Sequence, residues 1–462
     1  MNSRAGYLTL PLCLLLTVFY HMALNAQTFK LLRFDEDYSY LRTDSSRTFY
    51  EKLKYTPLTV KKSVYVSLGG ELRYEYAFKN NEDWENNGGG RDQSFLQRYV
   101  LLADFHAGNR FRLYAQVNSC IENGSKYGAG PADEDKLAVQ NFFAEYRIRG
   151  KRAKNLALRL GRQEIDYGSG RLISVREGTN VRLYFTGGKL TYSSPRFSVD
   201  GFVMMADNVR PGVFDNTSSK EANLWGAYSY LVVPKGGNFD FYYLGIRRDN
   251  ASFEEGTAKE VRHTVASRYW KYGNGFTYNL EAAYQFGRFG RGNISAWTTA
   301  IEVGYTFSNS RLKPSVNLRN DYISGDKNAG DGDLETFNPL FPKGGYFGFN
   351  PRIGPANLVD LHPYASVSFT DKLSMQADVV FNWRYSLNDG IYRPSGSFNL
   401  PGSASNERYI GTAYLLSAEY RFNKYTSFSC GAQYFDTGNF IRDIGANPPN
   451  SNFFNAQFTF KF

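Results

Sequence analysis

The chain ends in Asn455-Ala456-Gln457-Phe458-Thr459-Phe460-Lys461-Phe462, and this stretch decides the fold class. Successive side chains of an extended strand point to opposite faces, so the phenylalanines share one face and Gln457, Thr459 and Lys461 share the other. A strand with one aromatic face, one polar face and a terminal Phe is typical of an outer-membrane β-barrel. An edge strand of a soluble sandwich alternates in the same way, so the interpretation depends on whether the pattern repeats.

The alternation repeats along the chain in segments of about ten residues, the length that a tilted strand needs to cross a bilayer. The clearest examples are residues 111–119, 276–286, 297–307 and 376–386. An amphipathic helix would instead repeat its apolar residues at intervals of three and four. The pattern predicts about eighteen strands, an even number as single-chain bacterial barrels prefer. They are expected near 61–78, 93–106, 110–120, 138–149, 155–162, 182–192, 196–206, 222–233, 238–248, 259–269, 275–286, 295–307, 311–322, 361–370, 372–385, 410–421, 425–435 and 453–462.

The connections between these segments alternate strictly between short and long. A barrel of this class has short periplasmic turns and long external loops, whereas a soluble sandwich has no reason to alternate. We therefore expect an all-β, antiparallel, up-and-down transmembrane barrel over residues 61–462. The short links are 107–109, 193–195, 308–310 and 422–424, and the long links are 79–92, 121–137, 163–181, 207–221, 323–360, 386–409 and 436–452.

The composition of the 462 residues agrees with this class. Aromatic residues make up 17% of the chain and hydrophobic residues only 42%, and aromatic girdles at two membrane interfaces explain that combination. Beyond the N-terminus no apolar run approaches the roughly 18 residues of a membrane helix, so a closed sheet must do the spanning. The net charge of +10 suits an anionic partner, either lipopolysaccharide or an acidic solute, although a solvated surface explains it equally.

The first 26 residues predict an export signal, with Arg4 before an apolar run at 8–19 and a cleavage point after Ala26. Residues 27–60 are acidic and aromatic without clean alternation. They are expected to form either a periplasmic tail or a plug-like segment in the barrel mouth. The mature chain keeps Cys120 and Cys430, and nothing in the sequence brings them together as a disulfide.

Four stretches carry a resemblance to a known family. They are 68–73, 97–104, 158–180 and the pair 324–326 with 336–342, of which the third is the most specific, with Leu158-Arg159-Leu160-Gly161-Arg162-Gln163-Glu164 followed by Arg176-Glu177-Gly178-Thr179-Asn180. Over roughly residues 35–462 the chain resembles the alginate-export porins. The resemblance implies an eighteen-stranded barrel that passes alginate, a linear polyuronate, through an arginine-rich constriction. The family is broad, so the substrate does not follow from the fold.

Charged side chains on the inward-facing parity are the candidates for contact with a solute. Arginine leads them, and rings of Arg favour anions in a pore, because a guanidinium grips a carboxylate with two hydrogen bonds. The alternative is that each Arg only braces the wall, as in the expected pairs Arg73 with Glu71 and Glu75, Arg98 with Asp104, Arg319 with Asp321, and Arg421 with Glu419. The candidate pathway residues are Arg73, Arg98, Arg112, Arg147, Arg159, Arg162, Arg182, Arg319, Arg384 and Arg421.

The loop from Gln163 to Asn180 carries Arg171, Arg176 and Glu177. On the strength of the resemblance we expect it to fold inward as a constriction, and a solvated external loop is the alternative. Arg162 breaks the parity of its strand, so we expect a bulge at Gly161 to re-aim it.

Metal and enzyme chemistry are not expected. Asp326, Asn328, Asp331, Asp333 and Glu335 have oxygen ligands at a spacing that suggests calcium, but the EF-hand template fails at Gly330 and Phe337, which favours a solvated acidic loop. The sequence has no H-E-x-x-H, G-x-S-x-G or C-x-x-C motif. His362 beside Asp360 is the single hint of a catalytic pair, and an ordinary pair at a strand end is the alternative. No cofactor is expected.

The sequence thus predicts an outer-membrane porin that passes anionic solutes such as polyuronate or acidic oligosaccharide. The alternatives are a general small-solute porin, or a structural or surface-binding barrel plugged by its loops. The expected partners are outer-membrane lipid and lipopolysaccharide, an anionic polysaccharide or oligosaccharide, and the barrel-assembly machinery through Phe462. Nucleic acid is not expected, because the basic residues do not form one stripe.

Overall fold

The computed structural model describes residues 29–82, 84, 90–151, 154–234, 236–273, 275–445 and 450–462. The predicted export signal at 1–26 lies outside these residues. Within the described part of the chain, no helix is both long enough and apolar enough to cross a membrane.

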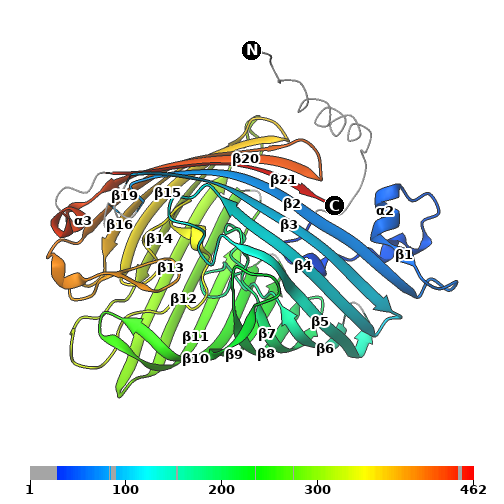
Figure 1. Cartoon of the computed structure of the whole chain (residues 1–462), viewed down its shortest axis with the longest axis horizontal. Coiled ribbons are helices and arrows are strands. Elements are labelled where there is room, and N and C mark those ends of the chain that lie inside the picture. Colours follow the sequence, from blue (N-terminus) through cyan, green and yellow to red (C-terminus); the bar gives the residue numbers. More distant parts are fainter. Residues whose placement is uncertain are drawn as a thin grey trace, which may run out of the picture.

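Eighteen long antiparallel strands form one closed barrel (Figure 1). Each strand pairs with its neighbours in sequence, and the ring closes where β2 (Val64–Asn80) pairs with β21 (Ser451–Lys461). This confirms the predicted fold class and strand count. The others are β3 (Arg91–Ala107), β4 (Phe111–Asn123), β5 (Asp135–Lys151), β6 (Lys154–Gln163), β7 (Phe185–Ser193), β8 (Phe197–Asn208), β9 (Thr217–Val233), β10 (Gly237–Phe253), β11 (Gly256–Lys271), β12 (Gly275–Phe289), β13 (Gly292–Thr306), β14 (Ser315–Ile323), β15 (Leu358–Ser368), β16 (Leu373–Arg384), β19 (Tyr409–Arg421) and β20 (Thr426–Thr437).

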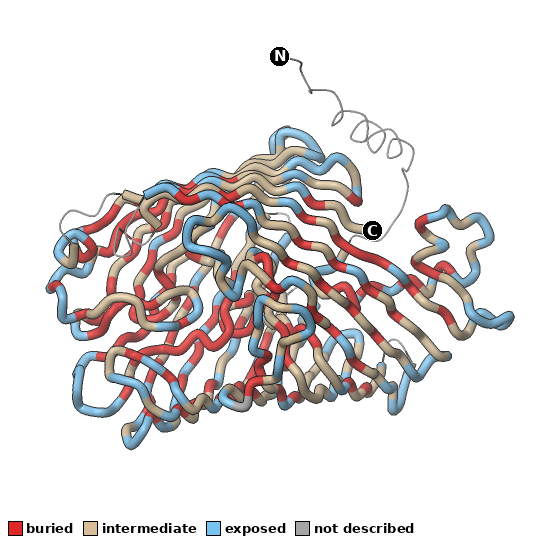
Figure 2. Tube along the Cα trace, in the orientation of Figure 1, coloured by how far each residue is buried: buried red, intermediate tan, exposed pale blue. Residues whose placement is uncertain are grey.

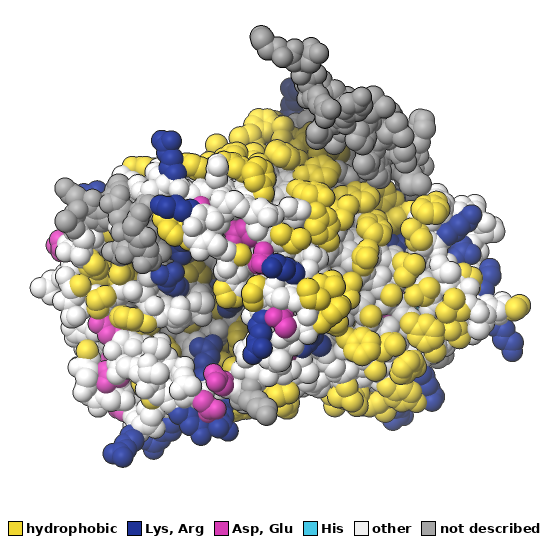
Figure 3. Space-filling view, viewed as in Figure 1, with side chains coloured by type: hydrophobic (Ala, Val, Ile, Leu, Met, Phe, Trp, Pro, Cys, Tyr) yellow, Lys and Arg dark blue, Asp and Glu magenta, His cyan; other side chains and the backbone are white. Residues whose placement is uncertain are grey.

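The two faces of the final strand divide as its sequence predicts. Phe458 is exposed on the outer wall opposite Tyr74 of β2, whereas Thr459 is buried. The same alternation runs along the other strands, as the banded tube of Figure 2 shows. Hydrophobic side chains cover the wall over β2–β6 in Figure 3. This outer surface is the one that meets lipid.

The prediction that short and long links alternate strictly is wrong at two places. On the long-loop side, β10 and β11 are joined by residues 254–255 alone, and β12 and β13 by residues 290–291 alone. In both cases the strands continue pairing past the predicted ends as far as Phe253–Gly256 and Phe289–Gly292. Ladder hydrogen bonds therefore satisfy backbone groups that a longer loop would have left to water.

Three long loops fold into the barrel and supply much of its core. They are residues 164–184, 324–357 and 385–408. Ile173 and Phe341 meet in a short parallel bridge between the first two loops, and both pack on inward-facing Leu244 and Ile246 of β10. The loops contain a 3₁₀ turn η3 (Gly344–Tyr346), the hairpin β17 (Ile391–Tyr392) with β18 (Phe398–Leu400), and η4 (Gly402–Ala404), and helix α3 (Asn439–Ile444) follows β20.

Residues 29–57 lie at the end of the barrel where the short turns are, on the side of β2–β6 (Figure 1). They form η1 (Arg33–Asp35), η2 (Ser39–Thr43), α2 (Phe49–Lys54) and β1 (Thr56–Pro57), which pairs with β2. Thr48 and Glu51 close the start of α2 with a capping box. The Phe34 ring packs edge-to-face against the inward-facing rings of Tyr114 and Phe143, which stack on each other, at centroid distances of 5.6 and 5.3 Å.

Candidate functional site: an arginine-lined lumen

The loop at 164–184 folds into the lumen and is anchored on opposite walls. On one side, Asn180 Nδ2 donates to the carbonyl oxygens of Gln97 and Asp133, at 3.2 and 2.8 Å. On the other side, Ser169 Oγ donates to the Glu281 carboxylate of β12 at 2.7 Å. Gly168 allows the turn between these anchors, because its φ is +63° and a Cβ there would lie 2.7 Å from the Tyr228 hydroxyl.

Three guanidiniums converge on the carboxylate of Glu177, and we call this group the arginine cradle. Arg98 Nη1 lies 3.4 Å from Glu177 Oε1, Arg182 Nε lies 3.2 Å from Oε2, and Arg73 Nη2 forms a shorter ion pair with Oε1. Glu71 supports the cradle from β2, at 3.5 Å from Arg73 and 3.2 Å from Arg98. The Glu177 side chain is 30% exposed while the three arginines are buried. The cradle therefore faces the open lumen through its carboxylate.

In the cradle, the nearby positive charges lower the pKa of Glu177 by more than burial raises it. Burial raises the pKa of Glu177, but the guanidiniums of Arg182, Arg73 and Arg98 hold that pKa well below its ordinary value. Arg98 is fixed further, because it also donates to the carbonyl oxygens of Thr179 and Asn180. The cradle thus holds a carboxylate of the loop between two wall arginines, Arg73 and Arg98, and Arg182 of the loop itself.

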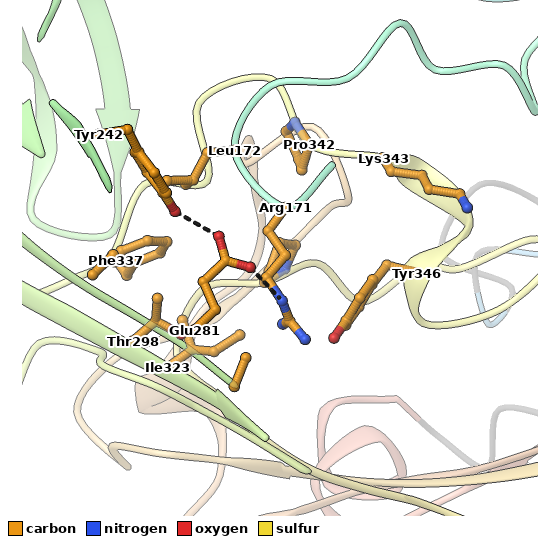
Figure 4. Close-up of a pocket in the computed structure, with 13 residues that line it drawn as sticks. Arg171, Leu172, Tyr242, Glu281, Thr298, Ile323, Phe337, Pro342, Lys343 and Tyr346 are labelled. Atoms are coloured by element: carbon orange, nitrogen blue, oxygen red, sulfur yellow. Dashed lines mark hydrogen bonds and ion pairs between the residues drawn. The ribbon is translucent and has the colours of Figure 1, made fainter. Parts of the chain in front are cut away.

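A second cluster closes the opposite side of the loop (Figure 4). Arg171 lies 2.6 Å from Asp321 Oδ1 and 3.3 Å from Glu281 Oε2. The Tyr346 ring lies between two guanidiniums, 4.2 Å from Arg171 and 4.4 Å from Arg319. The cavity left here has a volume of about 20 Å³, which is room for about one water molecule.

Larger cavities lie on the short-turn side of this cluster. One of about 390 Å³ is lined by Arg268, Arg319 and Lys343 together with tyrosines from the wall and from η3. Another of about 520 Å³ continues from it along β15–β21. A third, of about 470 Å³, lies between residues 34–42 and the first strands. Wide chambers on one side thus meet a tightly packed layer of loops.

The predicted pathway arginines divide into those that the loop brings together and those that it does not. Arg73, Arg98 and Arg182 form the cradle, and Arg171 anchors the far side. Arg384 is fully buried and donates to carbonyl oxygens such as those of Gly402 and Ser405. The remaining arginines are held locally: Arg112 by Asp104, Arg147 by the Asn109 carbonyl, Arg159 by Glu145, Arg162 by Asp207, Arg319 by Glu302 and Arg421 by Glu419.

Three of the predicted ion pairs are wrong. Arg98 does not pair with Asp104, because six residues of one extended strand separate them by about 20 Å. Arg98 instead meets Glu177, and Asp104 pairs with Arg112 at 2.7 Å. Arg319 does not pair with Asp321 because the next strand offers it Glu302 at 3.0 Å. The pairs of Arg73 with Glu71 and Arg421 with Glu419 are confirmed. Glu75 accepts a hydrogen bond from Asn455 at 2.8 Å instead of pairing with Arg73.

Gly161 is not a bulge. The register between β5 and β6 runs through it without a shift, and the shift on that ladder falls between Arg147 and Arg149. Gly161 has a φ of +132°, and a Cβ there would lie 2.3 Å from the Phe142 carbonyl oxygen. The glycine thus permits a close strand approach and leaves the register unchanged.

The other predicted clusters do not form reactive or metal sites. Within the part of the chain that the structure describes, no three His, Cys, Asp or Glu side chains are grouped to hold a metal ion. Asp331 and Asp333 accept hydrogen bonds from nearby backbone amides of their loop and of β13. Cys120 and Cys430 are both free thiols. His362 pairs with Asp378 at 2.9 Å and not with Asp360, which accepts from the Asp321 amide.

Sequence reasoning missed three residues that shape the constriction. Tyr346 carries no local signal, because it meets Arg171 only where two loops pack together. Glu281 carries one, since it lies on the polar, inward-facing parity of β12. Arg248 also carries a local signal, since it shares the inward parity of Leu244 and Ile246 in β10.

A closed barrel with a lipid-facing wall, a polar lumen and an inward-folded loop defines an outer-membrane porin. Such a barrel lies in the bacterial outer membrane, embedded in its lipid. The chain belongs to the alginate-export family, whose family model matches residues 64–455. Family and fold are those of transport porins and not of enzymes.

Solved porins share the fold at low sequence identity. The crystal structure of Acinetobacter baumannii OccAB1 matches with a TM-score of 0.59 and 13% identity, over 89% of this chain and 100% of that one. Pseudomonas aeruginosa OprD matches with a TM-score of 0.56 and 12% identity, over 86% of this chain and 93% of that one. A BenF-like porin from Pseudomonas fluorescens Pf-5 matches with a TM-score of 0.57 and 8% identity, over 86% and 98%. No curated protein matches the sequence significantly.

Proposed function

We propose that this porin passes anionic solutes, with polyuronate or acidic oligosaccharide as the class that fits its lumen. The observation that carries the proposal is the arginine cradle, in which three guanidiniums bind one carboxylate of the chain itself. Glu177 stands where a carboxylate of the solute would bind once the loop moves aside. Several such weak sites in series allow an anion to enter and still leave.

The cradle is tested by reversing its charge. We expect Arg98→Glu with Arg182→Glu to lower the permeability ratio of chloride to potassium, read from the reversal potential of the full chain in planar bilayers. Arg311→Glu with Arg196→Glu is the matched control, because these two exposed arginines make the same charge change at the short-turn end. Equal reversal potentials for the cradle variant and the unmodified protein would refute the role of the cradle.

A milder variant keeps the test decisive if the double variant does not fold. Glu177→Gln removes the internal carboxylate and leaves all three guanidiniums in place. We expect it to raise anion selectivity above that of the unmodified protein, because the cradle gains net positive charge. Lower or equal selectivity would count against the proposal.

The inward packing of three loops supports a second candidate, a structural or surface-binding barrel that its loops keep closed. The volume of about 20 Å³ beside Arg171 is its main support. Conductance separates the candidates, because an open anion-selective channel supports the first and the absence of any conductance supports the second. A channel without ion selectivity would indicate a general small-solute porin. For assembly, we propose that Phe462 is the residue through which the barrel-assembly machinery recognises the chain.

A further inference from the structure

Two arginines at the long-loop end of the lumen bind the same short stretch of loop. Arg176 Nε donates to the Pro342 carbonyl oxygen at 3.3 Å, and Arg248 Nη2 donates to the Leu340 carbonyl oxygen at 3.1 Å. Arg176 belongs to the constriction loop, and Arg248 lies toward the outer end of β10. Both side chains are half-buried. The two guanidiniums, from different parts of the chain, thus bind carbonyl groups two residues apart in one loop.

These two arginines differ from those of the cradle in lacking an acidic partner. Each cradle arginine has a carboxylate within 4.0 Å, and so does Arg171. Among the described residues, no carboxylate lies within that distance of Arg176 or Arg248. Glu260 is the acidic residue that attracts Arg248, but its carboxylate is bound by Arg262 at 2.5 Å and by Asn338 at 3.1 Å. Within the described part of the chain, the two guanidiniums therefore have no direct ion-pair partner.

The backbone holds this arrangement against its own preference. Arg176 and Leu340 have φ values of +56° and +60°, in the left-handed region that side chains other than glycine avoid. Strain of this kind persists where surrounding contacts enforce it, and it clusters at sites that bind ligands. Burial, and then the charge of Arg248, lower the pKa of Arg176 to about 10, so Arg176 stays charged at neutral pH.

We propose that Arg176 and Arg248 form an oxyanion site that receives a carboxylate of the solute at the outer end of the lumen, in series with the cradle. Each guanidinium donates one hydrogen bond to the loop, and its remaining N–H donors suit the two oxygens of a carboxylate. The Phe341 ring, 5.7 Å from the Arg248 guanidinium, forms an apolar side of the site and limits screening by water. The inference rests on the proposed passage of anions. It adds Arg248, and a binding position at the outer end of the lumen, to the proposed pathway.

The test is block of the chloride current by sodium glucuronate, a uronic acid, added on the long-loop side at constant ionic strength. We expect Arg248→Gln to raise the half-blocking concentration about tenfold, because one charge-assisted interaction is lost. Arg247→Gln is the matched control, since this neighbour is exposed, pairs with Asp249 and makes the same charge change. Equal half-blocking concentrations for Arg248→Gln and the unmodified protein, or equal increases in both variants, would overturn the site.

Binding measured without transport separates this site from the function. Isothermal titration calorimetry of glucuronate with the detergent-solubilised full chain should show binding that Arg248→Gln weakens and Arg247→Gln keeps. Arg248→Lys retains the charge without the fork and should weaken binding less than Arg248→Gln does, and it replaces that variant if the glutamine form does not fold. Anion selectivity in potassium chloride with no glucuronate binding would overturn this site and leave the proposed function standing. Glucuronate binding without anion selectivity would support this site and overturn the proposed function.

Discussion

At the scale of single residues, the lumen is a set of guanidiniums whose partners are chosen by the loops. Arg98 meets Glu177, because a residue 79 positions away along the chain folds back onto it. Tyr346 shows the same dependence, since its ring lies between Arg171 of one loop and Arg319 of the wall. A tyrosine face between two cations gains electrostatic attraction from both. The ring therefore ties the loop at 324–357 to the loop at 164–184.

Removing the Tyr346 ring should open the passage. Tyr346 lines both the cavity of about 20 Å³ and the chamber of about 390 Å³, so we expect Tyr346→Ala to join them and raise single-channel conductance. Tyr272→Ala is the control, because Tyr272 lines the chamber alone. Tyr346→Phe should behave as the unmodified protein does, since the hydroxyl is buried without a hydrogen-bond partner. Unchanged conductance in Tyr346→Ala would show that the ring does not close the passage.

At the scale of elements, residues 29–57 bind the seam where the first and last strands meet. Arg33 donates to the carbonyl oxygens of Gly70 and Phe462, at 3.1 and 2.9 Å. Lys54 of α2 comes so near that a Cβ on Gly69 would lie 2.5 Å from its Nζ. Three aromatic rings, including Tyr38 at 5.0 Å, surround that ammonium group. The segment thus binds both the first and the last long strand where the barrel closes.

The stability that residues 29–57 give to the barrel should depend on pH, because Lys54 titrates. Burial, and then the charge of Arg33, lower the pKa of Lys54 to about 7, whereas an unfolded lysine titrates near 10.4. Between these values the unfolded chain binds the extra proton, so stability rises as pH increases from about 7 toward 10 and is lost as pH falls toward 7. We expect the thermal unfolding midpoint in detergent to rise with pH from 7 to 9, and to rise less in Lys54→Met. Parallel pH profiles would contradict this assignment.

At the scale of the whole molecule, stability depends on an apolar exterior around a polar lumen. Leu101 of β3 is 60% exposed on the outer wall, while Arg98 and Asp104 of the same strand are buried inside. This arrangement inverts that of a soluble protein and is favourable only in lipid. It also explains how a chain with an aromatic content of 17% keeps a mean hydropathy of −0.46.

A charge on the lipid face should be costly at a depth where no water reaches it. We expect Leu101→Arg to lower the free energy of unfolding in lipid vesicles by about 2–4 kcal/mol. Gln93→Arg is the control, because Gln93 is exposed toward the long-loop end of the same strand, where the cost falls to about 0–1 kcal/mol. A similar loss in both variants would contradict the placement of the membrane around the middle of β3.

The sequence by itself determined the barrel, because a period of two over about ten residues is a local property that each strand carries alone. Phe458, Thr459 and their counterparts on other strands assign the faces without any tertiary information. The inward parity of Arg73 and Arg98 was readable for the same reason. The resemblance added the inward course of the loop at 163–180, which its residues alone left open.

Only the tertiary structure decided which charges meet. The cradle joins β2 and β3 to a loop about a hundred residues later, and the Tyr346 contact joins two loops and a wall strand. Such contacts arise from loop packing inside a closed ring, and loop paths have no sequence period to reveal them. The physical reason is that strand pairing is repetitive and local, whereas ion pairs in the lumen depend on the single arrangement that buries Ile173, Phe341 and the other apolar loop residues together.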